Sequence, residues 1–78
     1  MKDLLQFLIA KSTNSDKFDI TEDSQEGKVV FTISADPEII GMIIGKDGKN
    51  IKSIRKILSI KATLENKLVN ISVVEKSA

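Results

Sequence analysis

The stretch Ile43-Ile44-Gly45-Lys46-Asp47-Gly48-Lys49-Asn50-Ile51 places two glycines three residues apart between apolar residues. Glycine adopts positive φ angles readily and lets another backbone come close, so Gly45 and Gly48 predict a tight, exposed loop. A loop that opens a helix presents free N–H groups and the positive end of the helix dipole, and both attract a phosphate. The stretch therefore predicts an anion-binding turn, and the rest of the chain is interpreted as its scaffold.

Charge is distributed unevenly along the 78 residues. Residues 1–39 carry four lysines and eight acidic residues, a net charge of −4, whereas residues 40–78 carry eight basic and three acidic residues, a net charge of +5. The sum is the overall charge of +1. Between positions 46 and 61, Asp47 is the one acid among six basic residues, a distribution typical of a chain with one face for a polyanion. The six are Lys46, Lys49, Lys52, Arg55, Lys56 and Lys61.

Length and composition exclude several classes of protein. We expect a single domain over residues 1–78, with its core at about 3–75 and a frayed tail at 76–78, because a chain of this size is close to the lower limit for a self-sufficient core. The absence of Cys and His excludes a disulfide framework, a structural zinc site and a catalytic Cys or His. The start, Met1–Leu5, has an acid and no long apolar run, which predicts a cytoplasmic protein. We expect no metal and no cofactor.

The first half of the chain predicts a helix followed by a β-hairpin. Apolar residues spaced three and four apart predict a short helix from Asp3 to about Lys11, which the polar run 12–16 should end. Alternating residues predict one strand over 18–23 and a second over 28–34, joined by a turn at 24–27. The three aromatic residues are expected in the core; they are Phe7, Phe18 and Phe31.

The second half predicts two helices around the glycine loop and a last strand. Asp36-Pro37-Glu38 is a strong helix start, since Asp caps free N–H groups, Pro fits the first helical position and Glu favours the positive dipole end. After the loop a basic, amphipathic helix is predicted from about Gly48 to about Glu65, and a strand over 68–74. Gly41 is a poor helix former, which either close packing against a neighbour or the approach of a ligand backbone would explain. The isoleucines expected in the core are Ile39, Ile43, Ile54 and Ile57.

This order of elements describes an α+β domain with a three-stranded sheet covered on one face by helices. The segment Ile43–Ile51 resembles the Ile-Gly-x-x-Gly-x-x-Ile core of KH domains. The element order α-β-β-α-α-β is that of their type II fold, so the resemblance covers nearly the whole chain. The sequence is similar, in particular, to small bacterial proteins that consist of one KH domain.

The resemblance implies a module that binds single-stranded RNA and is not an enzyme. In KH domains, the two helices joined by the glycine loop form a narrow groove with an adjacent strand, and the groove takes about four nucleotides. Phosphates would contact Gly45, Lys46, Asp47 and Gly48, while Ile44, Ile51 and Gly41 would line or support the groove. Charge and helical spacing, and not the motif, add Lys49 and Lys52.

The resemblance implies two roles. The first is a low-specificity RNA chaperone or post-transcriptional regulator. The alternative is an assembly module whose essential partner is a protein, either a second copy in a homodimer or a larger protein that also contains a KH domain. Asp47 bears on the choice between RNA binding and protein assembly. Its carboxylate should repel a phosphate from the loop and so weaken RNA binding. No exposed aromatic residue is expected to stack on bases.

Two other motifs fit the sequence less well. The segment 41–47 is one residue short of a P-loop and has Asp where Ser or Thr should reach the metal. A helix-turn-helix would place the 48–65 helix in a DNA major groove, but that motif usually belongs to a helical bundle. Here a hairpin precedes the helix pair and a strand follows it.

Overall fold

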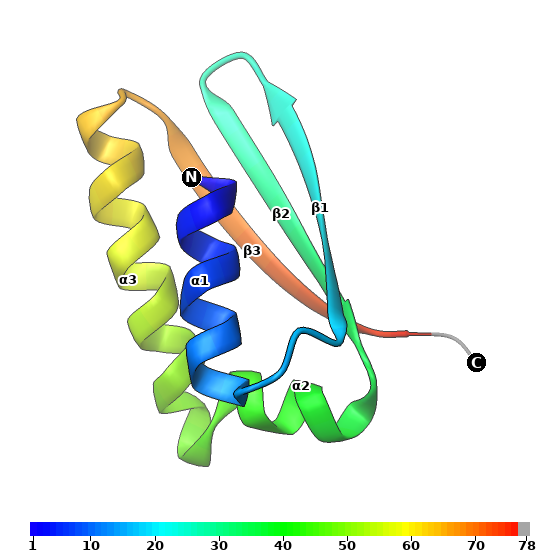
Figure 1. Cartoon of the computed structure of the whole chain (residues 1–78). Helices are drawn as coiled ribbons and strands as arrows, with labels where there is room; N and C mark the ends of the chain where they lie inside the picture. The colour runs from blue at the N-terminus through cyan, green and yellow to red at the C-terminus, as the bar shows by residue number, and fades with distance from the viewer. Residues whose placement is uncertain (77–78) are drawn as a thin grey trace.

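The computed structural model describes residues 1–76 and has the predicted order of elements (Figure 1). This α-β-β-α-α-β order, with three strands in one sheet, confirms the type II KH arrangement. Within residues 1–76, no helix combines the length and apolar character needed to cross a membrane. The elements are α1 (Lys2–Thr13), β1 (Phe18–Gln25), β2 (Lys28–Ala35), α2 (Pro37–Ile44), the 3₁₀ turn η1 (Lys46–Gly48), α3 (Lys49–Leu64) and β3 (Leu68–Glu75).

The sheet has the order β1-β2-β3, so β2 is central and β3 is an edge strand. The first two strands form the predicted antiparallel hairpin, with Phe18 opposite Ala35, and β3 pairs with β2 in parallel. On β2, alternate residues are buried, which is the pattern of a strand with one covered face. The buried side chains of that face are Val29, Phe31, Ile33 and Ala35.

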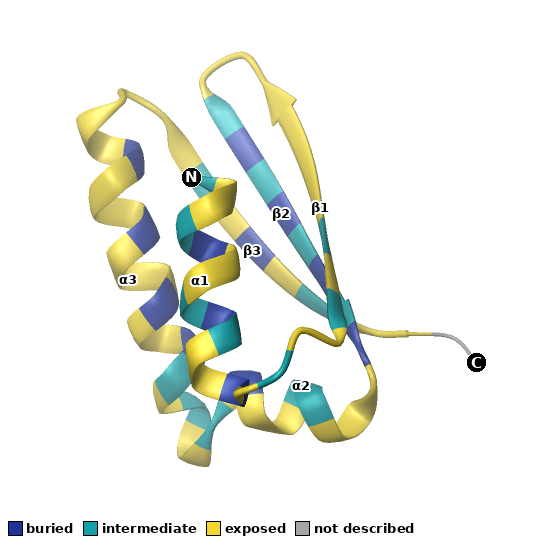
Figure 2. Cartoon of the chain, in the orientation of Figure 1, coloured by how far each residue is buried: buried dark blue, intermediate teal, exposed yellow. Residues whose placement is uncertain are grey.

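The helices cover one face of the sheet. Helices α1 and α3 lie side by side and run in opposite directions, while α2 lies across their lower ends (Figure 1). The buried residues of α1 and α3 form bands on their inner sides (Figure 2). Burying each such large apolar side chain stabilises the fold by roughly 1.5–3 kcal/mol. The main contributors from the helices are Leu5, Ile9, Ile43, Ile54 and Leu58.

Helix α1 is longer than predicted, because the polar run after Lys11 does not end it. Thr13 remains helical and its hydroxyl donates a hydrogen bond to the carbonyl oxygen of Ile9 at 2.9 Å. Asn14 then adopts the left-handed conformation, with φ 53°, and ends the helix. At the other end of the chain, Lys76 belongs to the predicted tail, yet its N–H donates to the carbonyl oxygen of Ala35 at 2.9 Å. Ser77 and Ala78 lie outside the described residues.

Two residues predicted to be buried are exposed. The Phe7 side chain is 57% exposed, because the sheet-facing side of α1 is already filled by Leu5 and Ile9. Its ring lies beneath the Lys11 ammonium, 5.7 Å from nitrogen to ring centroid. Ile57 is 41% exposed, since it directly precedes the buried Leu58 and is therefore turned about 100° from it around the helix. The prediction that every aromatic residue lies in the core was therefore wrong.

Candidate nucleic-acid interface

The turn between α2 and α3 depends on the absence of a side chain at Gly45. This residue has φ 73° and ψ 177°, a conformation that is essentially restricted to glycine. Its N–H donates to the carbonyl oxygen of Gly41 at 2.9 Å and so closes α2. A Cβ at Gly45 would lie 2.6 Å from the Cβ of Asn50 and 3.2 Å from its backbone nitrogen. The chain therefore turns sharply enough to bring the start of α3 against the end of α2.

Asp47 and Gly48 both adopt the left-handed conformation, with φ 57° and 72° respectively. Asp is one of the few residues other than glycine that tolerate this conformation, so Asp47 suits the backbone of the turn. Its side chain is exposed. Within residues 1–76, the one ion pair joins Lys76 to Asp19 at 3.1 Å, so no lysine neutralises the Asp47 carboxylate by direct contact.

Asn50 stabilises the turn through side-chain hydrogen bonds, a role that its place in the sequence did not predict. Its side-chain amide donates to the carbonyl oxygen of Met42 at 3.0 Å, and its Oδ1 accepts a hydrogen bond from the Ser12 hydroxyl at 3.4 Å. One side chain thus connects all three helices beside the loop. The signal in the sequence was an Asn two residues after Gly48, since Asn near a helix start often bonds to backbone groups.

Positive charge surrounds the turn. The side chains of Lys46, Lys49 and Lys52 are all exposed, as the prediction of a basic interface requires. No side chain caps the N-terminus of α3, and the positive end of its dipole faces the loop. The N–H groups of Gly48 and Lys49 donate within the turn, to the carbonyl oxygens of Gly45 at 3.2 Å and of Lys46. The positive end of the helix dipole and three flexible cations therefore occupy the same end of α3.

The apolar residues assigned to the groove differ in exposure. Ile44 is 38% exposed beside the turn, whereas Ile51 is 8% exposed and belongs to the core. Gly41 is exposed and lies three residues before Ile44, hence on the same side of α2. A Cβ at Gly41 would meet no atom within 4 Å, so close packing does not explain this glycine. The approach of a ligand backbone stays a prediction.

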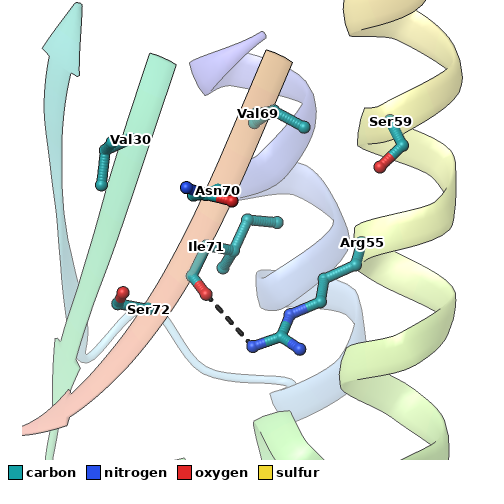
Figure 3. Close-up of a pocket in the computed structure, with 7 residues that line it drawn as sticks. All are labelled: Val30, Arg55, Ser59, Val69, Asn70, Ile71 and Ser72. Atoms are coloured by element: carbon teal, nitrogen blue, oxygen red, sulfur yellow. Dashed lines mark hydrogen bonds between the residues drawn. The ribbon is translucent and has the colours of Figure 1, made fainter. Parts of the chain in front are cut away.

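A cavity of about 350 Å³ opens between α3 and the edge strand β3 (Figure 3). The Arg55 side chain reaches across from α3, and its Nη2 donates a hydrogen bond to the carbonyl oxygen of Ile71 at 3.2 Å. Charge spacing could not show which basic residue of α3 faces β3, so Arg55 was missing from the predicted site. The other lining residues are Ser59 of α3, residues 69–72 of β3 and Val30 of β2.

The turn and the cavity are both built on α3. Arg55 follows Gly48 by seven residues, which is about 10 Å along a helix axis. An extended polyanion with its charge at the turn would therefore pass the cavity if it followed the helix. The start of α3 thus carries a cluster of cations at the glycine turn, and the middle of α3 borders a partly apolar cavity that contains hydrogen-bonding groups.

Comparisons with known proteins identify relatives of this chain over most of its length. A family model described as KhpA/KhpB, KH domain, matches residues 2–73. The chain is 34% identical over 76 residues to the RNA-binding protein KhpA of Clostridium acetobutylicum, covering 95% of this chain and 100% of the relative. It is 37% identical over 60 residues to the RNA-binding protein KhpA of Thermotoga maritima, covering 76% and 80%. The match to the RNA-binding protein KhpA of Aquifex aeolicus is 38% over 61 residues, covering 76% of each chain.

No solved structure matched the chain. The family model covers most of the sequence, from the first turn of α1 into β3, and therefore includes the glycine turn and the cavity. The chain belongs to the KhpA/KhpB family of KH domains.

Proposed function

We propose that this chain is a binding module for single-stranded RNA and not an enzyme. The observation that carries the proposal is the position of two complementary features on one helix, a cationic glycine turn at the start of α3 and an edge-strand cavity at its middle. The proteins matched from three bacteria bear the name RNA-binding protein KhpA. Apart from the Asp47 carboxylate, the charged groups of this surface are cations, which suits binding to a polyanion.

Binding would begin with electrostatic attraction to the surface formed by Lys46, Lys49 and Lys52. A phosphate would then settle against the turn, because turns in left-handed conformation direct backbone N–H groups into a concave anion site. Gly45 and Gly48 lack side chains that would keep a sugar-phosphate backbone at a distance. Asp47 opposes this step through its negative charge. The expected affinity is therefore moderate.

Bases would be held beside the exposed Ile44 and in the cavity between α3 and β3. The cavity offers the apolar Val69 and the polar Ser59 and Asn70, with backbone groups of the strand edge. It contains no aromatic side chain for stacking. The exposed Phe7 lies on α1, a different helix. We infer low sequence specificity and a cytoplasmic role as an RNA chaperone or post-transcriptional regulator.

The direct test is RNA binding by a charge-reversal variant of the turn. Fluorescence anisotropy with a labelled, unstructured RNA should give a measurable affinity for the wild type and a loss of more than tenfold for Lys46→Asp. The matched control is Lys67→Asp, the same exposed change beyond the opposite end of α3. Equal binding by both variants would refute the phosphate seat, and no binding by the wild type would refute the function.

A second candidate function, protein assembly, is favoured by apolar residues on the outer side of α3. We call Ile57, Ile60 and Leu64 the α3 seam; they are 41%, 57% and 77% exposed. Their spacing of three and then four residues is that of a helix which pairs with another helix. We propose that a second copy covers the seam, since a homodimer would enlarge the small core of a 78-residue chain. The alternative occupant is a KhpB-like partner that contains a KH domain.

A further inference from the structure

The free edge of β3 can be assigned residue by residue. The N–H of Leu68 donates to the carbonyl oxygen of Gly27 at 2.9 Å, and the N–H of Lys76 donates to that of Ala35 at 2.9 Å. These even-numbered residues therefore direct their backbone groups toward β2. Since backbone groups alternate in direction along a strand, Ile71 directs its N–H and carbonyl away from β2 and into the cavity.

Arg55 changes what this edge offers to a ligand. A bare strand edge presents one donor and one acceptor at each outward residue. Here the Arg55 guanidinium donates to the Ile71 carbonyl oxygen at 3.2 Å and takes one of its two lone pairs. Arginine has five N–H donors and no acceptor, so the remaining donors of the guanidinium are added to the Ile71 N–H. The wall of the cavity at Ile71 is thus rich in donors.

We propose that Arg55 makes this cavity selective for guanine, a deepening that rests on the proposed function of RNA binding. The O6 and N7 atoms of guanine are two adjacent acceptors, which a guanidinium binds with two parallel hydrogen bonds. Adenine presents the N6 amino group where guanine has O6. That amino group is itself a donor, so it would face the guanidinium donors without forming a hydrogen bond to them.

The other polar groups of the cavity do not oppose this preference. Ser59 and Asn70 each have side chains that both donate and accept hydrogen bonds, so they serve any base. Arg55 is the one charged residue that lines the cavity, and its side chain is exposed enough to turn toward an incoming base. Arg55 is therefore a specificity-determining residue at one nucleotide position, within a surface that otherwise has low specificity.

The test uses short, uridine-rich RNAs that differ only in carrying guanine or adenine at the same positions. Fluorescence anisotropy should show that the wild type binds the guanine RNA roughly fivefold more tightly or better, the discrimination of one bidentate contact. A third RNA that carries 7-deazaguanine lacks the N7 acceptor and should lose most of the advantage. Equal affinity for the guanine and adenine RNAs would overturn the inference while RNA binding itself stands. Binding of neither RNA would overturn both.

Variants then assign the preference to Arg55. Arg55→Met keeps a side chain of similar length but removes every hydrogen-bond donor, so it should bind both RNAs with equal affinity. The matched control is Lys56→Gln, which removes the adjacent charge and should weaken both RNAs equally while the guanine preference persists. Thermal melting checks that both variants fold. If Arg55→Met retained the guanine preference, Arg55 would not be its source.

Discussion

Asn50 occupies the space that a side chain at Gly45 would need, with its Cβ only 2.6 Å from the position of a Gly45 Cβ. The same Asn50 holds the last turn of α2 through its hydrogen bond to the carbonyl oxygen of Met42. The close approach and the hydrogen bond depend on each other, since moving Asn50 away would break the bond. The glycine motif is therefore first a packing device, and the proposed phosphate seat would depend on that packing.

Replacing Gly45 by Ala should destabilise the protein. The backbone conformation alone costs of order 1–3 kcal/mol for a residue with a side chain, and the contact with the Asn50 backbone adds to it. The free energy of unfolding from urea denaturation measures this loss. Gly41→Ala is the matched control, because its Cβ would meet no atom within 4 Å and should stabilise α2 by about 1 kcal/mol. Equal stability of both variants would contradict the packing role.

Replacing Asp47 by Asn should strengthen RNA binding without loss of stability. Asn tolerates the left-handed conformation as Asp does, while the change removes the charge that repels a phosphate. The screened Coulomb energy at an exposed site predicts a gain of roughly two- to fivefold in affinity. Asp47→Ala removes the same charge but should also lose about 1 kcal/mol of stability. Unchanged affinity in Asp47→Asn would show that no phosphate lies near residue 47.

Most of the fold was predictable because its signals are local. The alternation along β2, Pro37 at the start of α2 and the two glycines each specify a backbone conformation without reference to distant residues. Asp36 is the N-cap residue of α2 as predicted, but its side chain makes no capping hydrogen bond. The error at Phe7 has the opposite origin. Phe7 is an apolar residue of the predicted helix, but the side of α1 that meets the sheet is decided by packing against residues far along the chain.

The candidate site was predictable in part, because a motif defines the glycine turn while charge and helical spacing indicate Lys49 and Lys52. The Gly45–Gly48 turn and its lysines follow from sequence, whereas Arg55 is one of several basic residues on α3 with similar spacing. Its contact with Ile71 depends on where β3 lies, and that position follows from parallel pairing with β2. The two roles of Asn50 also required the structure, because they join three helices.

The dependence of RNA binding on salt should identify which lysines contact phosphates. For single strands, each phosphate contact contributes about −0.7 to the slope of log affinity against log salt concentration. Lys52→Gln should therefore make the slope less steep by about 0.7. Lys61→Gln is the control, because Lys61 lies on α3 away from the turn. A slope that changes equally in both variants would indicate a diffuse effect of charge, without a defined contact at Lys52.

Replacing Ile60 by Asp should prevent self-association. Ile60 is the middle residue of the α3 seam, so a charge there would have to be buried between two copies. Analytical ultracentrifugation should show a dimer for the wild type and a monomer for the variant. Phe7→Asp is the matched control, because Phe7 is also 57% exposed but lies on α1; this variant should remain dimeric. A wild type that stays monomeric at high concentration would exclude the homodimer. Loss of dimer in both variants would indicate general sensitivity to surface charge and would refute the seam as the contact.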